Sequence, residues 1–94
     1  MTTSPDKAIT AAHVEKEVLE FLTARTKQSW DPDTDLFADG GVSSLFAMEL
    51  VVFLEEAFGI VIAGADLRLD NFRTVLRMME LVRRLSTNDL VHGG

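Results

Sequence analysis

The chain has 94 residues, of which 47% are hydrophobic, and its formal net charge is −6 at pH 7. This length is sufficient for one small domain with a single hydrophobic core. The absence of cysteine excludes disulfide scaffolds, zinc–thiolate sites and cysteine nucleophiles, and it makes a reducing cytoplasm the simplest compartment. We find no secretory signal and no apolar run long enough to cross a membrane, so no membrane partner is expected.

Acidic residues are concentrated in the middle of the chain, where residues 28–67 contain eight Asp or Glu and no Lys or Arg. Such a region repels nucleic-acid phosphates, so we expect no nucleic-acid partner. The same field favours partner proteins with basic docking patches. The alternative interpretation is a solvated acidic surface that only keeps the protein soluble.

The first expected helix covers roughly residues 11–26. Thr10 is a suitable N-cap, and Ile9 and Val14 on either side of it fit a hydrophobic staple. The apolar stripe of this helix repeats at helical spacing and contains Val14, Val18, Phe21 and Leu22. Residues 1–9 before it are interpreted as a flexible leader.

A long connection is expected over about residues 27–42. Asp-Pro, Asp-Gly and Gly-Gly pairs interrupt it, while Trp30, Leu36 and Phe37 are apolar anchors that would hold it against the core. Its acidic start resembles a calcium loop. However, Leu36 stands where such a loop requires Gly and Val42 where it requires Glu, so we expect no metal.

The second expected helix covers about residues 44–58 and ends at Gly59, a suitable residue for a helix C-terminus. At 100° per residue, its core face contains five apolar residues: Ala47, Leu50, Val51, Leu54 and Phe58. The opposite face combines apolar and acidic side chains: Leu45, Met48, Glu49, Val52 and Glu56, with Glu55 close to the line of Ser44. This combination is typical of a partner-docking face. The alternative is a helix that is buried on most sides.

The segment after the second helix begins with Ile60-Val61-Ile62, which is too short to form a sheet alone and is interpreted as a buried loop. One short helical turn is expected near residues 66–69. The last helix would be capped by Asp70 or Asn71 and would end near Leu85. Its apolar residues would be Phe72, Val75, Leu76, Met79 and Val82. Residues 87–94 are interpreted as a flexible tail.

No set of catalytic residues can be assembled from the sequence. His13 stands in the first turn of the first helix and His92 in the tail, and nothing places either beside Ser44 as a catalytic triad requires. The carboxylates lie on an open helix face rather than in a pocket. We therefore do not expect hydrolase activity. Taken alone, a serine at a helix start such as Ser44 is an ordinary N-cap.

The sequence on both sides of Ser44 resembles that of the acyl carrier protein family. Ser44 is followed by Leu45 and then by Glu-Leu-Val, Leu-Glu-Glu and Phe58, all at the family's spacing without a gap. Residues 35–42 resemble the loop before the attachment serine of that family. Residues 71–75 resemble the start of its last helix.

Two positions differ from the usual family pattern. The family usually has Asp immediately before the attachment serine, where this chain has Ser43, and an acidic residue two positions after it, where this chain has Phe46. Ser43 raises the question of which serine is modified, and the downstream spacing favours Ser44. Residues 36–40 and 70–74 look closest to discrete bacterial carriers of secondary metabolism.

The resemblance implies an all-α fold, namely a four-helix acyl-carrier-like bundle of three longer helices and one short helix, with a long loop between the first two. The carrier domain would cover residues 10–86, between the leader 1–9 and the tail 87–94. It implies a non-catalytic carrier with a covalent 4′-phosphopantetheine at Ser44, derived from coenzyme A. This arm would hold acyl intermediates or a dedicated building block as a thioester, in polyketide or related secondary-metabolite biosynthesis.

The implied partners are a phosphopantetheinyl transferase and an acyl-loading enzyme, acyltransferase or ketosynthase with basic docking patches. They would meet the apolar and acidic residues of the second helix: Leu45, Met48, Glu49, Val52, Glu55 and Glu56. We expect a monomer. Two alternatives stay open: an aminoacyl or peptidyl carrier of a nonribosomal-peptide-type pathway, and a helical adaptor without a prosthetic group in which Ser44 is only a cap.

Overall fold

The computed structural model of the chain describes residues 10–38 and 42–93, with side chains up to Ser86. Over these residues the elements in chain order are α1 (Ala11–Thr26), α2 (Phe46–Phe58), η3 (Gly64–Asp66), η4 (Leu69–Phe72) and α3 (Val75–Gly93), where η marks a 3₁₀ helix. The described residues contain no strand, so the expected all-α, acyl-carrier-like bundle is confirmed. The expected leader 1–9 and the Gly40-Gly41 turn lie outside the described residues.

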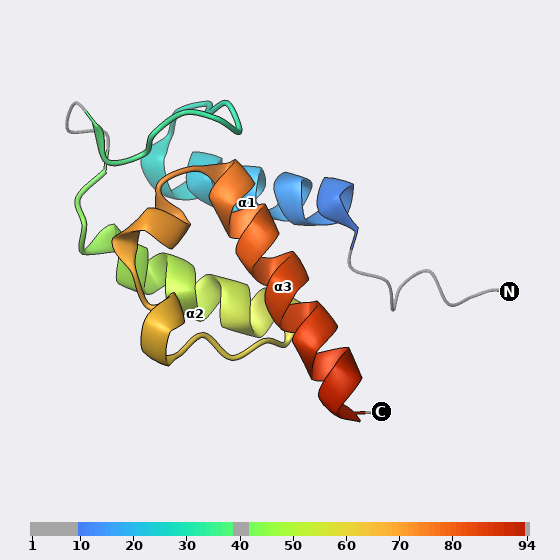
Figure 1. Cartoon of the computed structure of the whole chain (residues 1–94). Coiled ribbons are helices and arrows are strands. Elements are labelled where there is room, and N and C mark those ends of the chain that lie inside the picture. Colours follow the sequence, from blue (N-terminus) through green and yellow to red (C-terminus); the bar gives the residue numbers. More distant parts are fainter. Residues whose placement is uncertain (1–9, 39–41, 94) are drawn as a thin grey trace, which may run out of the picture.

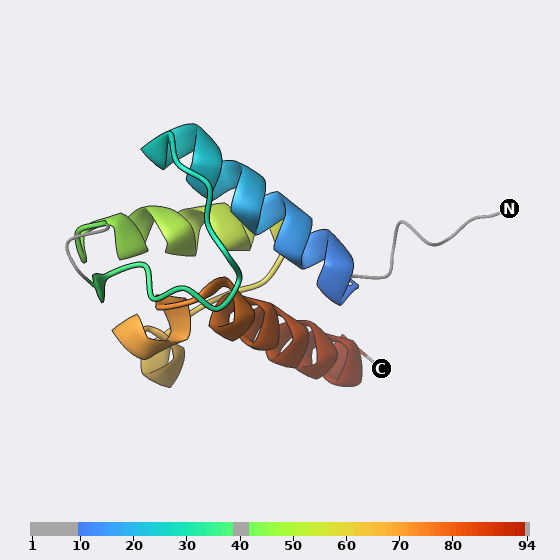
Figure 2. The same ribbon diagram turned by 90° about the horizontal axis from the view of Figure 1, so that it is seen from above.

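The three α-helices surround one core, and η3 and η4 connect the end of α2 to the start of α3 (Figure 1). The loop after α1 passes the start of α3 before it reaches α2 (Figure 2). Fifteen buried apolar residues from the three α-helices, η4 and the connecting loops form the core: Val14, Val18, Leu22, Leu36, Leu50, Val51, Leu54, Phe58, Ile60, Ile62, Phe72, Val75, Met78, Leu81 and Val82. No helix among the described residues is both long and apolar enough to cross a membrane.

Helix α1 has the bounds that its sequence predicts. The Thr10 hydroxyl accepts a hydrogen bond from the His13 N–H at 3.1 Å, which satisfies one of the unpaired donors of the first turn. Lys27 ends the helix in the left-handed conformation, with φ of 63°, and its N–H donates to the Thr23 carbonyl. The expected stripe faces the core, with Phe21 half-buried at its edge.

The long loop is anchored where the sequence predicts. Leu36 is fully buried, and burial of a leucine stabilises a fold by about 2 kcal/mol. Its N–H donates to the Arg73 carbonyl at 2.7 Å, and the Leu76 N–H donates to the Pro32 carbonyl at 3.0 Å, so the loop is bonded to the start of α3. The two other expected anchors also pack on the core: Trp30 and Phe37.

Helix α2 begins at Phe46, two residues later than expected. The Ser43 carbonyl accepts from the Phe46 N–H at 3.0 Å and the Ser44 carbonyl from the Ala47 N–H at 3.1 Å, and these three-residue spacings define a tight turn before the α-helix. The C-terminus is as predicted, because Gly59 has φ of 65° and its N–H donates to the Glu55 carbonyl at 2.9 Å.

The start of the last helix differs from the prediction. Asp70 and Asn71 belong to η4 and do not cap α3; instead the Thr74 hydroxyl accepts from the Arg77 N–H at 3.0 Å. The reason is that both earlier side chains have other partners. Asp70 accepts from Arg73 at 2.7 Å, and the Asn71 amide donates to the carbonyl of residue 66 at 2.9 Å.

Helix α3, which begins at Val75, differs from its prediction in two further ways. Leu76, expected in the core, is 49% exposed, and Met78 is buried in its place. The helix also continues to Gly93, beyond the expected end near Leu85. The segment after α2 agrees in part with its prediction of a buried loop, because Ile60 and Ile62 are buried outside any strand whereas Val61 is 75% exposed.

Candidate functional site

Ser44 lies in the tight turn that leads into α2, and the residue is exposed. The N-cap position of α2 is Leu45, where no side chain makes a capping hydrogen bond. Among the described residues, the hydroxyl groups of Ser43 and Ser44 have no hydrogen-bond partner. Ser44 therefore does not serve as a helix cap, and its hydroxyl is available to another molecule.

The backbone around Ser44 suits a negatively charged group. The N–H groups of Ser44 and Leu45 have no acceptor among the residues that the structure describes. They lie at the N-terminal end of α2, where the helix dipole is positive. A phosphate ester on the serine oxygen would meet these donors and a favourable field there.

An exposed apolar line continues from Ser44 along one side of α2. Leu45 is 78% exposed, Met48 61% and Val52 50%. Met48 and Val52, four residues apart, lie on one side of α2, and Leu45 directly follows Ser44 in the turn before the helix. The alternative of a helix buried on most sides is therefore wrong.

The three acidic residues of α2 differ in their surroundings. Glu49 forms an ion pair with Arg25 of α1. Glu55 is half-buried, and its carboxylate accepts a hydrogen bond from the Ile62 N–H at 2.9 Å, which ties the following loop to the helix. Glu56 is exposed and has no ion pair with any described residue.

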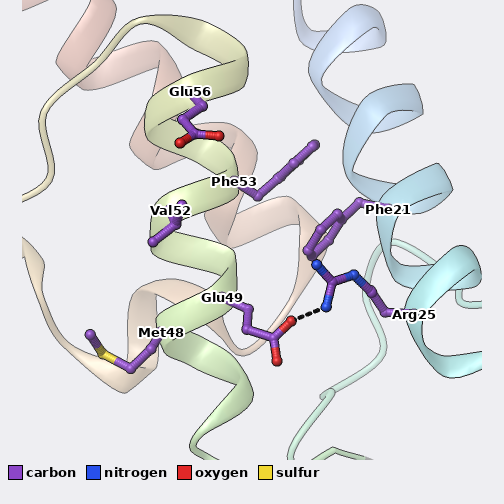
Figure 3. A pocket seen from close by; sticks show the side chains of 7 residues that line it. All are labelled: Phe21, Arg25, Met48, Glu49, Val52, Phe53 and Glu56. Carbon is purple, nitrogen blue, oxygen red and sulfur yellow. Dashed lines mark hydrogen bonds and ion pairs between the residues drawn. The ribbon is translucent and has the colours of Figure 1, made fainter.

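A groove of about 530 Å³ runs between α1 and α2 beside this line (Figure 3). It is lined by Phe21, Arg25, Met48, Glu49, Val52, Phe53 and Glu56. The Phe21 and Phe53 rings stack with centroids 4.2 Å apart, and the Arg25 guanidinium lies 5.0 Å from the Phe21 centroid. The helical stripe predicts Phe21 in the core, and nothing in the sequence indicates Arg25, because no local pattern marks a contact across 24 residues.

The described side chains around Ser44 do not form a catalytic arrangement. His13 packs edge-on against Phe58, at the opposite end of α2, with ring centroids 6.0 Å apart. No group of three metal-binding side chains occurs within the described part of the chain. The pKa shifts belong to surface ion pairs elsewhere: the hydrogen bond from Arg83 lowers the pKa of Glu80, for example.

The fold and the site together define a class, that of small helical domains with an exposed serine at the start of the second helix. The family model described as phosphopantetheine attachment site matches residues 14–82, which extend from the first turns of α1 into α3. The chain belongs to this family, which is consistent with the acyl carrier proteins that its sequence resembles. Comparison with curated proteins and with solved structures gives no match.

Family membership establishes the general role. The domain is an attachment site for 4′-phosphopantetheine, and the chain is a phosphopantetheine carrier protein. When bound, this group supplies a terminal thiol that forms thioesters. Carriers of this family are generally non-catalytic, and they interact with a phosphopantetheinyl transferase and with biosynthetic enzymes.

Proposed function

We propose that this protein carries acyl intermediates or a dedicated building block as a thioester on 4′-phosphopantetheine at Ser44, in polyketide or related secondary-metabolite biosynthesis. The chain itself has no catalytic role in this proposal. The observation that carries it is the exposed Ser44, whose hydroxyl caps no helix and stands beside N–H groups that have no acceptor among the described residues. The partner supplies the transfer chemistry, and Ser44 supplies an accessible oxygen.

Ser44 is preferred over Ser43 because of its position relative to α2. Both residues are exposed, so exposure does not distinguish them. The spacing of Leu45 and of the residues of α2 after Ser44 resembles that of the carrier family, and Ser44 directly precedes the exposed Leu45. An enzyme that docks on Leu45 would have the Ser44 oxygen at the edge of its contact surface.

The docking surface in this proposal consists of the exposed apolar residues Leu45, Met48 and Val52 together with the acidic residues Glu49, Glu55 and Glu56. Apolar contact provides most of the binding energy, and the acids orient a partner with a basic patch. The structure supports unequal roles for the acids. The Glu55 carboxylate accepts a hydrogen bond from the Ile62 N–H, so Glu49 and Glu56 are the better candidates for contact with a partner.

The test is the intact mass of the protein after incubation with coenzyme A and a broad-specificity phosphopantetheinyl transferase. Wild type, Ser43→Ala and Ser44→Ala are treated in parallel. Because neither hydroxyl makes a capping bond, each variant should lose less than about 0.5 kcal/mol of stability, below the usual cost of a lost cap. We expect one added phosphopantetheine on wild type and Ser43→Ala and none on Ser44→Ala.

Two other outcomes would contradict the proposal. If Ser43→Ala is not modified, the attachment site is Ser43 rather than Ser44. If folded wild type is not modified, the result argues against carriage by this chain. The cargo class needs a second step, in which loaded protein is offered acyl-transferring and amino-acid-activating enzymes. Exclusive loading with an amino acid would favour the aminoacyl or peptidyl alternative.

A further inference from the structure

We propose that Arg25 is an internal competitor for Glu49, so that a partner enzyme must displace Arg25 with its own Lys or Arg to use the full docking surface. The segment of the partner that binds over the groove between α1 and α2 presents a basic side chain next to an apolar one. This inference rests on the proposed function. It adds a residue of α1 to a surface otherwise made by α2.

The first step of the argument is the distribution of charge on the groove. Glu49 and Glu56 both line it, and Arg25 is the only cation among the described residues that do so. Arg25 is paired with Glu49, while Glu56 has no ion pair with any described residue. A basic side chain of a partner therefore finds one free carboxylate and one that is already neutralised.

The second step is the support that holds Arg25 in place. Its guanidinium lies 5.0 Å from the centroid of the Phe21 ring, and that ring stacks on Phe53. Figure 3 shows Glu49 extending from α2 toward Arg25, beside the two stacked rings. The α1 side of the groove is thus an apolar wall with a cation at its rim.

The third step is that the ion pair is weak enough to open. The side chains of Arg25 and Glu49 are 53% and 47% exposed. Exposed pairs contribute little because water screens both charges and two long side chains must be held in one geometry. A partner cation that comes with apolar contact can replace Arg25 without unfolding the domain.

The chain contains a matched control for this idea. Arg83 and Glu80 form a second exposed ion pair, three residues apart on α3 and away from the α1–α2 groove. Arg25→Gln and Arg83→Gln change the net charge equally, and each frees one carboxylate. The long side chain of glutamine also preserves much of the cover over the Phe21 ring.

The experiment measures kcat and KM of a phosphopantetheinyl transferase, the probe enzyme, for wild type, Arg25→Gln, Arg83→Gln and the double variant Arg25→Gln/Glu49→Gln. We expect a two- to fivefold lower KM for Arg25→Gln, about the range of an exposed ion pair, with kcat unchanged. The KM of Arg83→Gln should equal that of wild type. In the double variant the decrease in KM seen for Arg25→Gln should be lost. At about 1 M salt, where the Debye length is about 3 Å, the decrease in KM for Arg25→Gln should disappear.

Equal KM values for Arg25→Gln and Arg83→Gln would overturn the inference, because net charge alone would then explain any change. A higher KM for Arg25→Gln would also overturn it, since Arg25 would then assist docking. Circular dichroism and thermal unfolding confirm that each variant is folded. Complete modification of wild type at saturating transferase tests the proposed function separately, so a failure of the competition alone leaves carriage at Ser44 intact.

Discussion

Three glutamates on one helix have three different surroundings. Glu49 is paired across the groove, Glu55 accepts from a backbone N–H, and Glu56 faces solvent. Residue type and helical position predict the same role for all of them, whereas the structure distinguishes a paired, a structural and an available carboxylate. The residue that a partner meets without first breaking an internal contact is Glu56.

Reversal of the charge at Glu56 should therefore weaken docking while the fold is preserved. For Glu56→Lys we expect roughly a three- to thirtyfold higher KM for the transferase, because an attraction of up to about 1 kcal/mol becomes a repulsion of similar size. The control is Asp33→Lys, which makes the same charge change at an exposed residue of the long loop. Equal effects of the two substitutions would show that the position of Glu56 has no special role.

At the scale of elements, backbone geometry at the helix ends sets where each helix starts and stops. Gly59 ends α2 with φ of 65°, a conformation that costs residues with a Cβ about 1 kcal/mol or more. Apart from Gly59 itself and its two chain neighbours, no heavy atom of the described residues lies within 4 Å of the position that a Cβ would take there, so steric contact adds nothing to this cost. The penalty is a property of the backbone conformation alone.

Gly59→Ala should accordingly lower the free energy of unfolding by about 1 kcal/mol, measured by urea titration. Gly59→Asn is the matched comparison and should lose less, because asparagine tolerates the left-handed region better than alanine. A stability of Gly59→Ala equal to that of wild type would mean that the turn relaxes to another conformation. Transferase kinetics should remain normal in both variants, because neither substitution changes a side chain of the docking surface.

At the scale of the whole molecule, Arg73 connects parts of the chain that are far apart in sequence. Its guanidinium donates to Asp70 at 2.7 Å and to Asp35 in the long loop at 3.4 Å, while its carbonyl accepts from the Leu36 N–H. The hydrogen bond and charge of Arg73 lower the pKa of Asp70. The loop that leads to Ser44 is thus held to η4 by groups that depend on ionised carboxylates.

The sign of the resulting pH dependence follows from the lowered pKa of Asp70. The folded state binds this proton less readily than the unfolded chain, so the stabilisation is present above the usual aspartate pKa of about 4 and is lost as the pH falls below it. We expect the urea midpoint of wild type to fall between about pH 6 and about pH 3, the range over which aspartate titrates. The urea midpoint of Asp70→Asn should fall less over the same range. Asp31→Asn, at an exposed loop residue, should retain the wild-type slope. An equal slope in all three proteins would contradict this role of Asp70.

The sequence by itself determined the features that are local to one element. The Thr10 cap, the Gly59 terminus and the buried and exposed faces of α2 all follow from side-chain type and helical period, because neighbours three and four residues apart share one face. The resemblance around Ser44 was confirmed at the level of the family. The choice of Ser44 and its docking residues stays a prediction, to be tested as described above.

Only the tertiary structure decided the contacts between elements. The Arg25–Glu49 pair joins two helices, Glu55 reaches the loop beyond its own helix, and Thr74 replaces the expected caps because Asp70 and Asn71 are engaged elsewhere. Helical periodicity describes how one helix divides into faces and contains no information on which residue of another helix lies opposite. Which carboxylates remain free for a partner therefore depends on packing, and packing is a property of the folded chain as a whole.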